Sequence, residues 1–177
     1  PEIASCSLET MKQFLITGFL IVSFLKVNGQ VTTYQPGEKI NYIIHYGVVT
    51  GGEATLQIDR DTSAGSELWR SVMVGKTTGF IDALFKVKDI YESYIDPATE
   101  LPVKSIRNIS EGKYKRYNVV LFDHSSRQDS AILTSDMTGV HITEQGIHDI
   151  LSCFYWFRNR ILPGIDSLKK GDVFTIT

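Results

Sequence analysis

The chain has 177 residues, of which 42% are hydrophobic and 21% charged, and its formal net charge is −2. This charge balance argues against a nucleic-acid-binding role, because domains that bind phosphate backbones usually carry a strong basic excess on one face. The length left after the N-terminal segment described below suits one domain, residues 30–177, better than two.

Residues 11–29 have the composition of a secretory signal peptide. Lys12 follows the first methionine, Met11, and a nearly continuous apolar run extends over residues 14–25. This run is too short to span a membrane as a helix, which takes about 20 residues. We therefore expect an exported protein that does not span the membrane after signal cleavage, located in the periplasm or associated with the outer envelope. Residues 1–10 precede the methionine and are interpreted as a spurious upstream extension.

Most of the chain after the signal peptide alternates between apolar and polar residues, which is the period of a β-strand. The connections between the alternating runs are short, and short connections favour antiparallel pairing of neighbouring runs. A hairpin turn is predicted at Thr50-Gly51-Gly52, between the first two runs. The predicted strands are 39–46, 53–59, 67–74, 85–95, 103–109, 113–122, 130–133 and 139–143, with a last strand beginning near Val173.

One segment, residues 147–161, has the period of an amphipathic helix. Apolar residues recur there at intervals of three and four, and Pro163-Gly164 follows as a stop signal. Asp149 is expected in the first turn and Arg158 in the last turn, where the helix dipole favours each charge. Further apolar residues lie off this stripe, so the helix is expected to be buried on more than one side. The prediction is a mainly β fold, in which an antiparallel meander forms a curved sheet or incomplete barrel packed around this one α-helix.

The sequence predicts no nucleotide, metal or other cofactor site. Gly75-Lys76-Thr77 has the form of the end of a phosphate-binding loop, but Arg70 occupies the position of the leading glycine. The four histidines, at positions 45, 124, 141 and 148, do not pair at the spacings of a metal site.

The spacing of His148 and Ser152, i and i+4, places them on one side of a helix. The imidazole and the hydroxyl could meet there as a base and a nucleophile. A serine in an amphipathic helix is more typical of close packing against a sheet, and no G-x-S-x-G turn is present. We therefore assign no catalytic residue. An envelope hydrolase, with active-site residues partly in a missing C-terminal region, is kept as the alternative function.

Short motifs occur in a defined order along residues 34–164. They are residues 34–42 leading to Tyr46-Gly47, then Gly51-Gly52-Glu53-Ala54, Asp96-Pro97 to Leu101-Pro102, Glu111-Gly112-Lys113-Tyr114, and Asp149-Ile150-Leu151-Ser152 with Tyr155 and Arg158. Together they resemble the exported bacterial family catalogued as DUF3108, a domain of unknown function. The resemblance implies an envelope protein without established chemistry, and members that are typically longer at the C-terminus. Since alternation resumes at Gly171 and reaches Thr177 without a cap, we expect the C-terminal part of the domain to be missing.

The candidate binding residues lie on the predicted helix. Tyr155 and Arg158 are spaced i, i+3 and share a face, with Asp149 earlier on the helix. An arginine with such an aromatic neighbour would anchor an anionic headgroup or a strand-end carboxylate. Phe154 and Trp156 are the further candidate binding residues. In the alternative interpretation, Arg158 caps the helix and pairs with an acidic residue on the sheet. The predicted function is a non-enzymatic binding or scaffold protein for a hydrophobic ligand or an envelope partner, with a lipid or an envelope protein as the expected partner.

Overall fold

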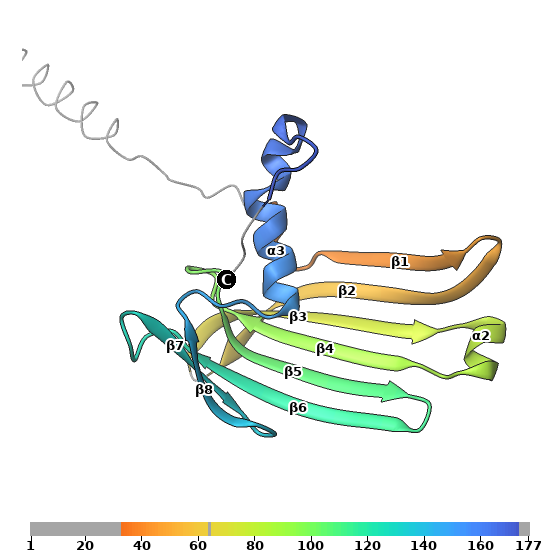
Figure 1. Cartoon of the computed structure of the whole chain (residues 1–177), viewed down its shortest axis with the longest axis horizontal. Helices are drawn as coiled ribbons and strands as arrows, with labels where there is room; N and C mark the ends of the chain where they lie inside the picture. Colours follow the sequence, from red (N-terminus) through yellow and green to blue (C-terminus); the bar gives the residue numbers. More distant parts are fainter. Residues whose placement is uncertain (1–32, 64, 174–177) are drawn as a thin grey trace, which may run out of the picture. The chain divides into compact units, whose positions relative to one another are not determined.

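A computed structural model describes residues 33–63 and 65–173. They form eight strands with two α-helices and one 3-10 helix (Figure 1). The predicted signal peptide lies outside the described residues. So do residues 174–177, which belong to the last strand predicted to begin near Val173. The elements are β1 (Lys39–Tyr46), β2 (Val49–Ser63), β3 (Ser66–Thr77), α2 (Gly79–Leu84), β4 (Lys88–Ile95), β5 (Pro102–Glu111), β6 (Tyr114–Asp123), β7 (Ser130–Ser135), β8 (Gly139–Glu144), α3 (Ile150–Arg160) and η1 (Leu162–Ser167).

The strands form a single sheet in the order β1-β2-β3-β4-β5-β6-β7-β8. Every neighbouring pair is antiparallel, as short connections require. Within the described part of the chain, β1 and β8 are the two edges, and the sheet curves without closing (Figure 1). The predicted mainly β fold, an antiparallel meander forming a curved sheet with one main helix, is confirmed.

The first hairpin turn lies three residues earlier than predicted. Tyr46 pairs with Val49, so the turn consists of Gly47 and Val48, and Gly47 has a φ of 60°. Two-residue hairpin turns need a positive φ, which glycine adopts without a steric penalty. Gly51 and Gly52, predicted in the turn, belong to β2, where Gly52 pairs with Ile44.

A short helix, α2, lies between β3 and β4, and β4 begins at Lys88, three residues later than the predicted strand 85–95. Thr77 Oγ1 donates to Asp82 Oδ1 at 2.8 Å and accepts from Val87 N at 2.9 Å, so it joins the end of β3 to both sides of the helix. None of the residues of α2 is buried. Phe85 and Lys86 therefore lie outside the strands, because α2 ends directly before them, and Val87 forms only an isolated bridge with Glu111.

Helix α3 begins with Ile150, three residues later than predicted, because Asp149 is its N-cap and not part of its first turn. Asp149 Oδ1 accepts from Ser152 N at 2.8 Å, while Asp149 N donates to Ser152 Oγ at 3.0 Å. This reciprocal pair is a capping box, which satisfies two backbone donors at the start of the helix. The buried face comprises Leu151, Ser152 and Tyr155, whereas Ile150, on the predicted apolar stripe, is 58% exposed.

The core lies where α3 crosses the sheet (Figure 1). Ser71 and Ser93 pair across β3 and β4, and both are fully buried. Their small side chains leave room for Tyr155, whose hydroxyl lies 3.4 Å from Ser71 Oγ. We call the side of the sheet that carries these serines the helix-facing side. The buried hydrophobic residues of this core are Tyr34, Leu56, Ile58, Ile95, Leu151 and Tyr155.

Candidate functional site

A groove of about 260 Å³ lies between the start of α3 and the helix-facing side of the sheet. Strand register explains its composition, because residues paired across an antiparallel sheet point to the same side. Ser105 pairs with Val120, and Phe122 pairs with Leu133, so the walls come from β5, β6 and β7. Leu151 of α3 closes the other side. The groove is thus a mainly apolar hollow between one helix and the floor of the sheet.

Arg107 is the cation of this groove. It pairs with Tyr91 on β4 and with Asn118 on β6, and its guanidinium carbon lies 5.7 Å from the centre of the Tyr91 ring. Its Nε is buried without a hydrogen-bond partner, and no carboxylate of a described residue lies within 4.0 Å of the guanidinium. The aromatic contact therefore orients the Arg107 side chain but does not balance its charge.

Asn118, the other polar side chain on the same rung, is already engaged. Its Nδ2 donates to Ser135 Oγ at 2.9 Å and to Asp136 Oδ1 at 2.6 Å. These bonds tie β6 to the connection between β7 and β8. The amide hydrogens of Asn118 are therefore used by the fold and do not serve a ligand in the groove.

His148 and Asp149 form the polar end of the groove at the start of α3, and the buried Ser152 lies behind them. His148 Nδ1 lies 3.2 Å from Ser152 Oγ, so the contact predicted from their spacing is present. Burial lowers the pKa of His148 below its ordinary value, and this effect is only partly offset by the Asp149 carboxylate. Ser152 is 1% exposed, and its hydroxyl also bonds both Asp149 N and Asp149 O. The geometry therefore gives this serine a capping role and no open path to a substrate.

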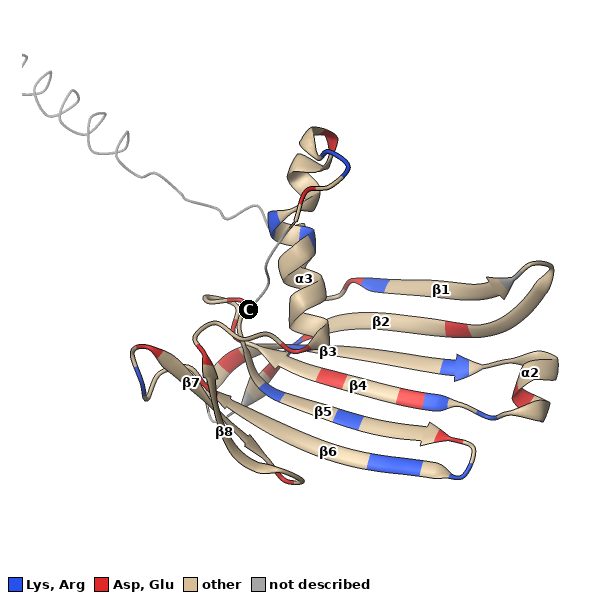
Figure 2. Ribbon diagram, in the orientation of Figure 1, with Lys and Arg blue, Asp and Glu red and all other residues tan. Residues whose placement is uncertain are grey.

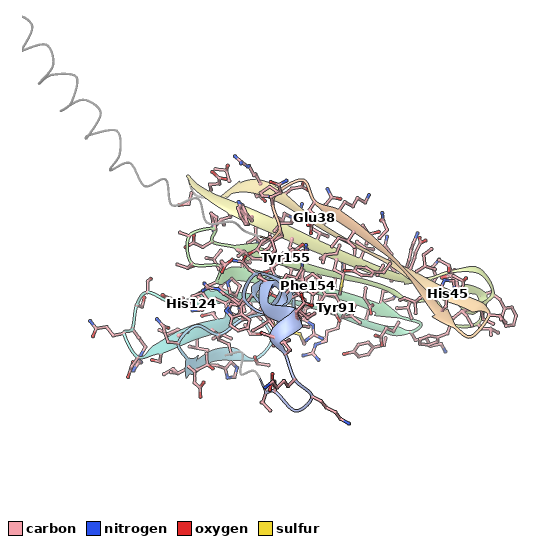
Figure 3. All side chains as sticks on the ribbon, turned by 90° about the horizontal axis from the view of Figure 1, so that it is seen from above. Glu38, His45, Tyr91, His124, Phe154 and Tyr155 are labelled. Atoms are coloured by element: carbon pink, nitrogen blue, oxygen red, sulfur yellow. The ribbon has the colours of Figure 1, made fainter. Side chains whose placement is uncertain are left out.

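The predicted binding residues are divided between two places. Asp149 lines the groove, and its Oδ2 is buried without a partner. Tyr155 lies in the core at 1% exposure, and burial raises the pKa of its hydroxyl. Phe154 packs against the same core, and the centre of the Trp156 ring lies 6.2 Å from the centre of the His148 ring. Figure 3 shows Tyr91, Phe154 and Tyr155 gathered around α3, whereas His45 lies at the far end of β1.

Arg158 adopts the arrangement of the alternative interpretation. Its Nη2 donates to Glu38 Oε2 at 3.0 Å and to Thr33 O at 3.1 Å. The Glu38 carboxylate, which directly precedes β1, therefore uses the charge that a headgroup would need. Figure 2 shows the basic residues of α3 at its C-terminal end, away from the N-cap Asp149. The prediction that Arg158 and Asp149 act on one ligand thus has no support from their positions.

A second polar cluster, around Glu100, also belongs to the fold. Glu100 is 5% exposed, with a φ of 63°, and its carboxylate accepts from Tyr34 Oη at 3.3 Å. Asn159 Nδ2 donates to the same carboxylate at 2.6 Å, and Arg160 Nη2 donates at 3.2 Å. The residue is thus held in an unfavourable backbone conformation by three partners. This cluster fastens the end of α3 to the β4–β5 connection.

Sequence reasoning missed Arg107 and the apolar walls of the groove. Along β5, Ser105, Arg107 and Ile109 point to the helix-facing side, while Lys104 and Ile106 point away. Both sides of this strand therefore mix polar and apolar residues, so alternation does not identify the inner one. No pattern within this strand singles out Arg107, and its place in the groove follows only from the register of β4, β5 and β6.

Within the described residues, no group of three or more histidine, cysteine, aspartate or glutamate side chains is arranged to hold a metal ion. The helices that the structure describes are all too short or too polar to cross a membrane. Gly75, Lys76 and Thr77 are extended residues of β3 and form no loop around a phosphate.

Comparison with known proteins adds the family. No curated protein and no solved structure matches the chain. The model of the family described as "Protein of unknown function (DUF3108)" matches residues 41–177, which is most of the chain and all but the start of the sheet. The resemblance noted in the sequence motifs is therefore confirmed, and the chain belongs to the DUF3108 family.

Proposed function

We propose that this protein is a non-enzymatic binding protein that holds the apolar part of a hydrophobic ligand between α3 and the helix-facing side of the sheet. The observation that carries the proposal is the groove of about 260 Å³ with its mainly apolar lining. Binding sites for small molecules are typically concave and apolar, with a few placed polar groups. The groove meets that description at the start of α3.

The size of the groove limits what it holds. Its volume of about 260 Å³ lies just below the usual range for ligand pockets, which is roughly 300–1,000 Å³. A single acyl segment suits this volume better than a whole two-chain lipid. The ligand would therefore be a small amphiphile or one chain of a larger envelope lipid. The signal-peptide pattern supports this class of ligand, because an exported protein meets lipids and lipid-modified proteins in the envelope.

The alternative function, an envelope hydrolase, would rest on the contact of 3.2 Å between His148 and Ser152. Two observations favour the binding function over it. The Ser152 hydroxyl is buried, and the capping box uses it. A nucleophile needs room beside it for the substrate carbonyl and for oxyanion donors, and a hydroxyl at 1% exposure does not offer that room.

The test compares a variant whose groove is filled by a tryptophan side chain with a variant that carries the tryptophan outside the groove. Val120→Trp places an indole in the groove, and Leu121→Trp places the same side chain on the opposite side of β6, where Leu121 is 50% exposed. Protein purified from cells that express the full chain would be analysed by native mass spectrometry for a co-purified lipid, and by titration with the neutral dye Nile red.

We expect wild type and Leu121→Trp to bind the dye and Val120→Trp to lose most of that binding, with all three folded by circular dichroism. Equal binding by both tryptophan variants would place the ligand elsewhere and reject the groove. A wild-type protein that carries no lipid and binds no dye would reject the proposed function itself.

A further inference from the structure

We propose that the ligand of this groove is an anionic amphiphile whose carboxylate or phosphate headgroup binds the Arg107 guanidinium, an inference that rests on the proposed function and makes it specific. The proposal rests on the position of Arg107, which has no carboxylate partner among the described residues and lines a mainly apolar groove.

The state of Arg107 differs from that of Arg70 and Arg160. Arg70 Nη2 donates to Glu92 Oε2 at 2.6 Å, and Arg160 Nη2 lies 3.2 Å from Glu100 Oε2. In both pairs the carboxylate balances the charge of the guanidinium. Arg107 has no such neighbour among the described residues, although its Nε is buried. A buried N–H without a hydrogen-bond partner costs free energy, so a ligand oxygen bound to Nε would relieve a cost that the empty groove carries.

The other charges of the groove do not neutralise Arg107. The Glu92 carboxylate, one residue from Tyr91, turns to the opposite side of the sheet and pairs with Arg70. Asp149 lines the groove but forms no ion pair with Arg107, and its Oδ1 is bonded to Ser152 N at the start of α3. The N-terminal end of a helix carries partial positive charge, which offsets part of the Asp149 charge. A net attraction for an anion is left at Arg107.

The register sets the direction in which the ligand lies. Arg107 shares a rung with Asn118, and the next rung of the helix-facing side holds Ser105 and Val120. Phe122 pairs with Leu133 one rung further along. Asn118 and Phe122 are four residues apart, which is roughly 14 Å along a strand. A headgroup at Arg107 therefore places its alkyl chain over Val120 and Phe122, against Leu151 of α3.

A guanidinium suits both candidate headgroups. Its planar fork of donors matches the two oxygens of a carboxylate and those of a phosphate equally well. The contact with the Tyr91 ring restricts the Arg107 side chain before binding, which reduces the loss of rotamer freedom on binding. A free fatty acid and a phosphate-bearing lipid thus share the recognised chemistry, and the experiment separates them.

The experiment measures displacement of Nile red from the full-length chain by decanoate, decyl phosphate and decanol, which share an alkyl chain and differ in the headgroup. We expect at least one of the two anions to bind about tenfold or more tightly than the alcohol, as a charge-assisted hydrogen bond in a partly buried site provides. Arg107→Gln should remove this preference and leave decanol binding nearly unchanged. The ratio of decanoate to decyl phosphate binding identifies the headgroup.

Lys104→Gln is the matched control. It removes one positive charge from the same strand, three residues away, on the side that faces away from α3, where Lys104 Nζ lies 5.1 Å from the centre of the Tyr94 ring. The anion preference should persist in this variant. Arg107→Lys keeps the charge and is expected to retain part of the preference, which guards against a loss caused by misfolding in Arg107→Gln.

The outcomes separate this inference from the function beneath it. Equal binding of anions and alcohol by wild type, or an anion preference that survives Arg107→Gln, overturns the headgroup assignment while groove binding stands. Failure of all three compounds to displace the dye, or of the dye to bind, overturns both.

Discussion

Arg158 Nη2 lies 3.0 Å from Glu38 Oε2 and joins the last turn of α3 to the residue that precedes β1. The two side chains are only 16% and 24% exposed, so the pair is shielded from much of the solvent. It connects residues that are 120 positions apart in the chain. Arg158, a candidate headgroup ligand from the sequence, thus forms an ion pair that joins the helix to the start of the sheet.

Replacing Glu38 with glutamine should lower the free energy of unfolding by about 1–3 kcal/mol, because it leaves the Arg158 guanidinium partly buried without its counter-charge. Urea unfolding followed by circular dichroism measures this change. Glu53→Gln is the control, since Glu53 pairs with Lys76 at 2.7 Å but both side chains are about half exposed. Exposed pairs contribute little to stability. Equal midpoint shifts in the two variants would contradict the structural role of the Arg158–Glu38 pair.

Gly52 is required by a close approach between β2 and β3. A Cβ atom at this position would lie 2.7 Å from Lys76 O, a backbone atom that cannot move without disturbing the strand pairing. Gly52→Ala should therefore cost about 1–3 kcal/mol, the usual range for an overpacked position. Gly75→Ala is the control, because a Cβ there meets nothing within 4 Å. We expect that variant to be neutral or slightly more stable in thermal unfolding, and a Gly52→Ala variant of wild-type stability would show that the strands separate easily.

His148 should make the protein less stable in mild acid. Burial is the largest cause that lowers its pKa below the ordinary value of 6.5, followed by the opposing effect of Asp149 and a further lowering by His124. The unfolded chain therefore binds a proton at a higher pH than the folded chain does. The stabilising effect of the neutral ring is present above pH 6.5 and declines as the pH falls through the folded pKa.

The measurement is urea unfolding at about pH 7.5 and about pH 5, on either side of the ordinary histidine pKa. His148→Gln should lose less stability between these two conditions than wild type does. His141→Gln, at an exposed position on β8, should keep the wild-type dependence. If removing His148 leaves the difference between the two conditions unchanged, the burial of its ring does not govern the acid response.

Alternation was enough to predict the antiparallel meander, because each strand pairs with the next one and short connections permit little else. It misplaced features that depend on the partner. The turn at Gly47 needed the pairing of Tyr46 with Val49, and the true start of α3 needed the bonds between Asp149 and Ser152. The helical period placed both Leu151 and Ile150 on the buried face, but only Leu151 is buried there, and the stripe did not include the buried Tyr155. The shape of the sheet selects which residues fit.

The candidate site was less predictable than the fold. Asp149 was named from the sequence and does line the groove, but its neighbours there come from strands that are distant in the chain. Arg107 and Leu133 meet on one side of the sheet only because β5, β6 and β7 pair in a particular register. A shift of that register by one residue would turn these side chains to the other side, and no motif in the sequence specifies it.

The order of the elements along the chain has a consequence for biosynthesis. All strand pairings join sequence neighbours, so a nascent polypeptide that has emerged as far as β8 is able to complete its sheet. Leu56 and Ile58 are then still exposed to water, because the element that covers them, α3, has not yet emerged. The complete sheet therefore forms before α3 packs on it. Until α3 packs, the helix-facing side of the sheet is the apolar surface that a chaperone would have to protect.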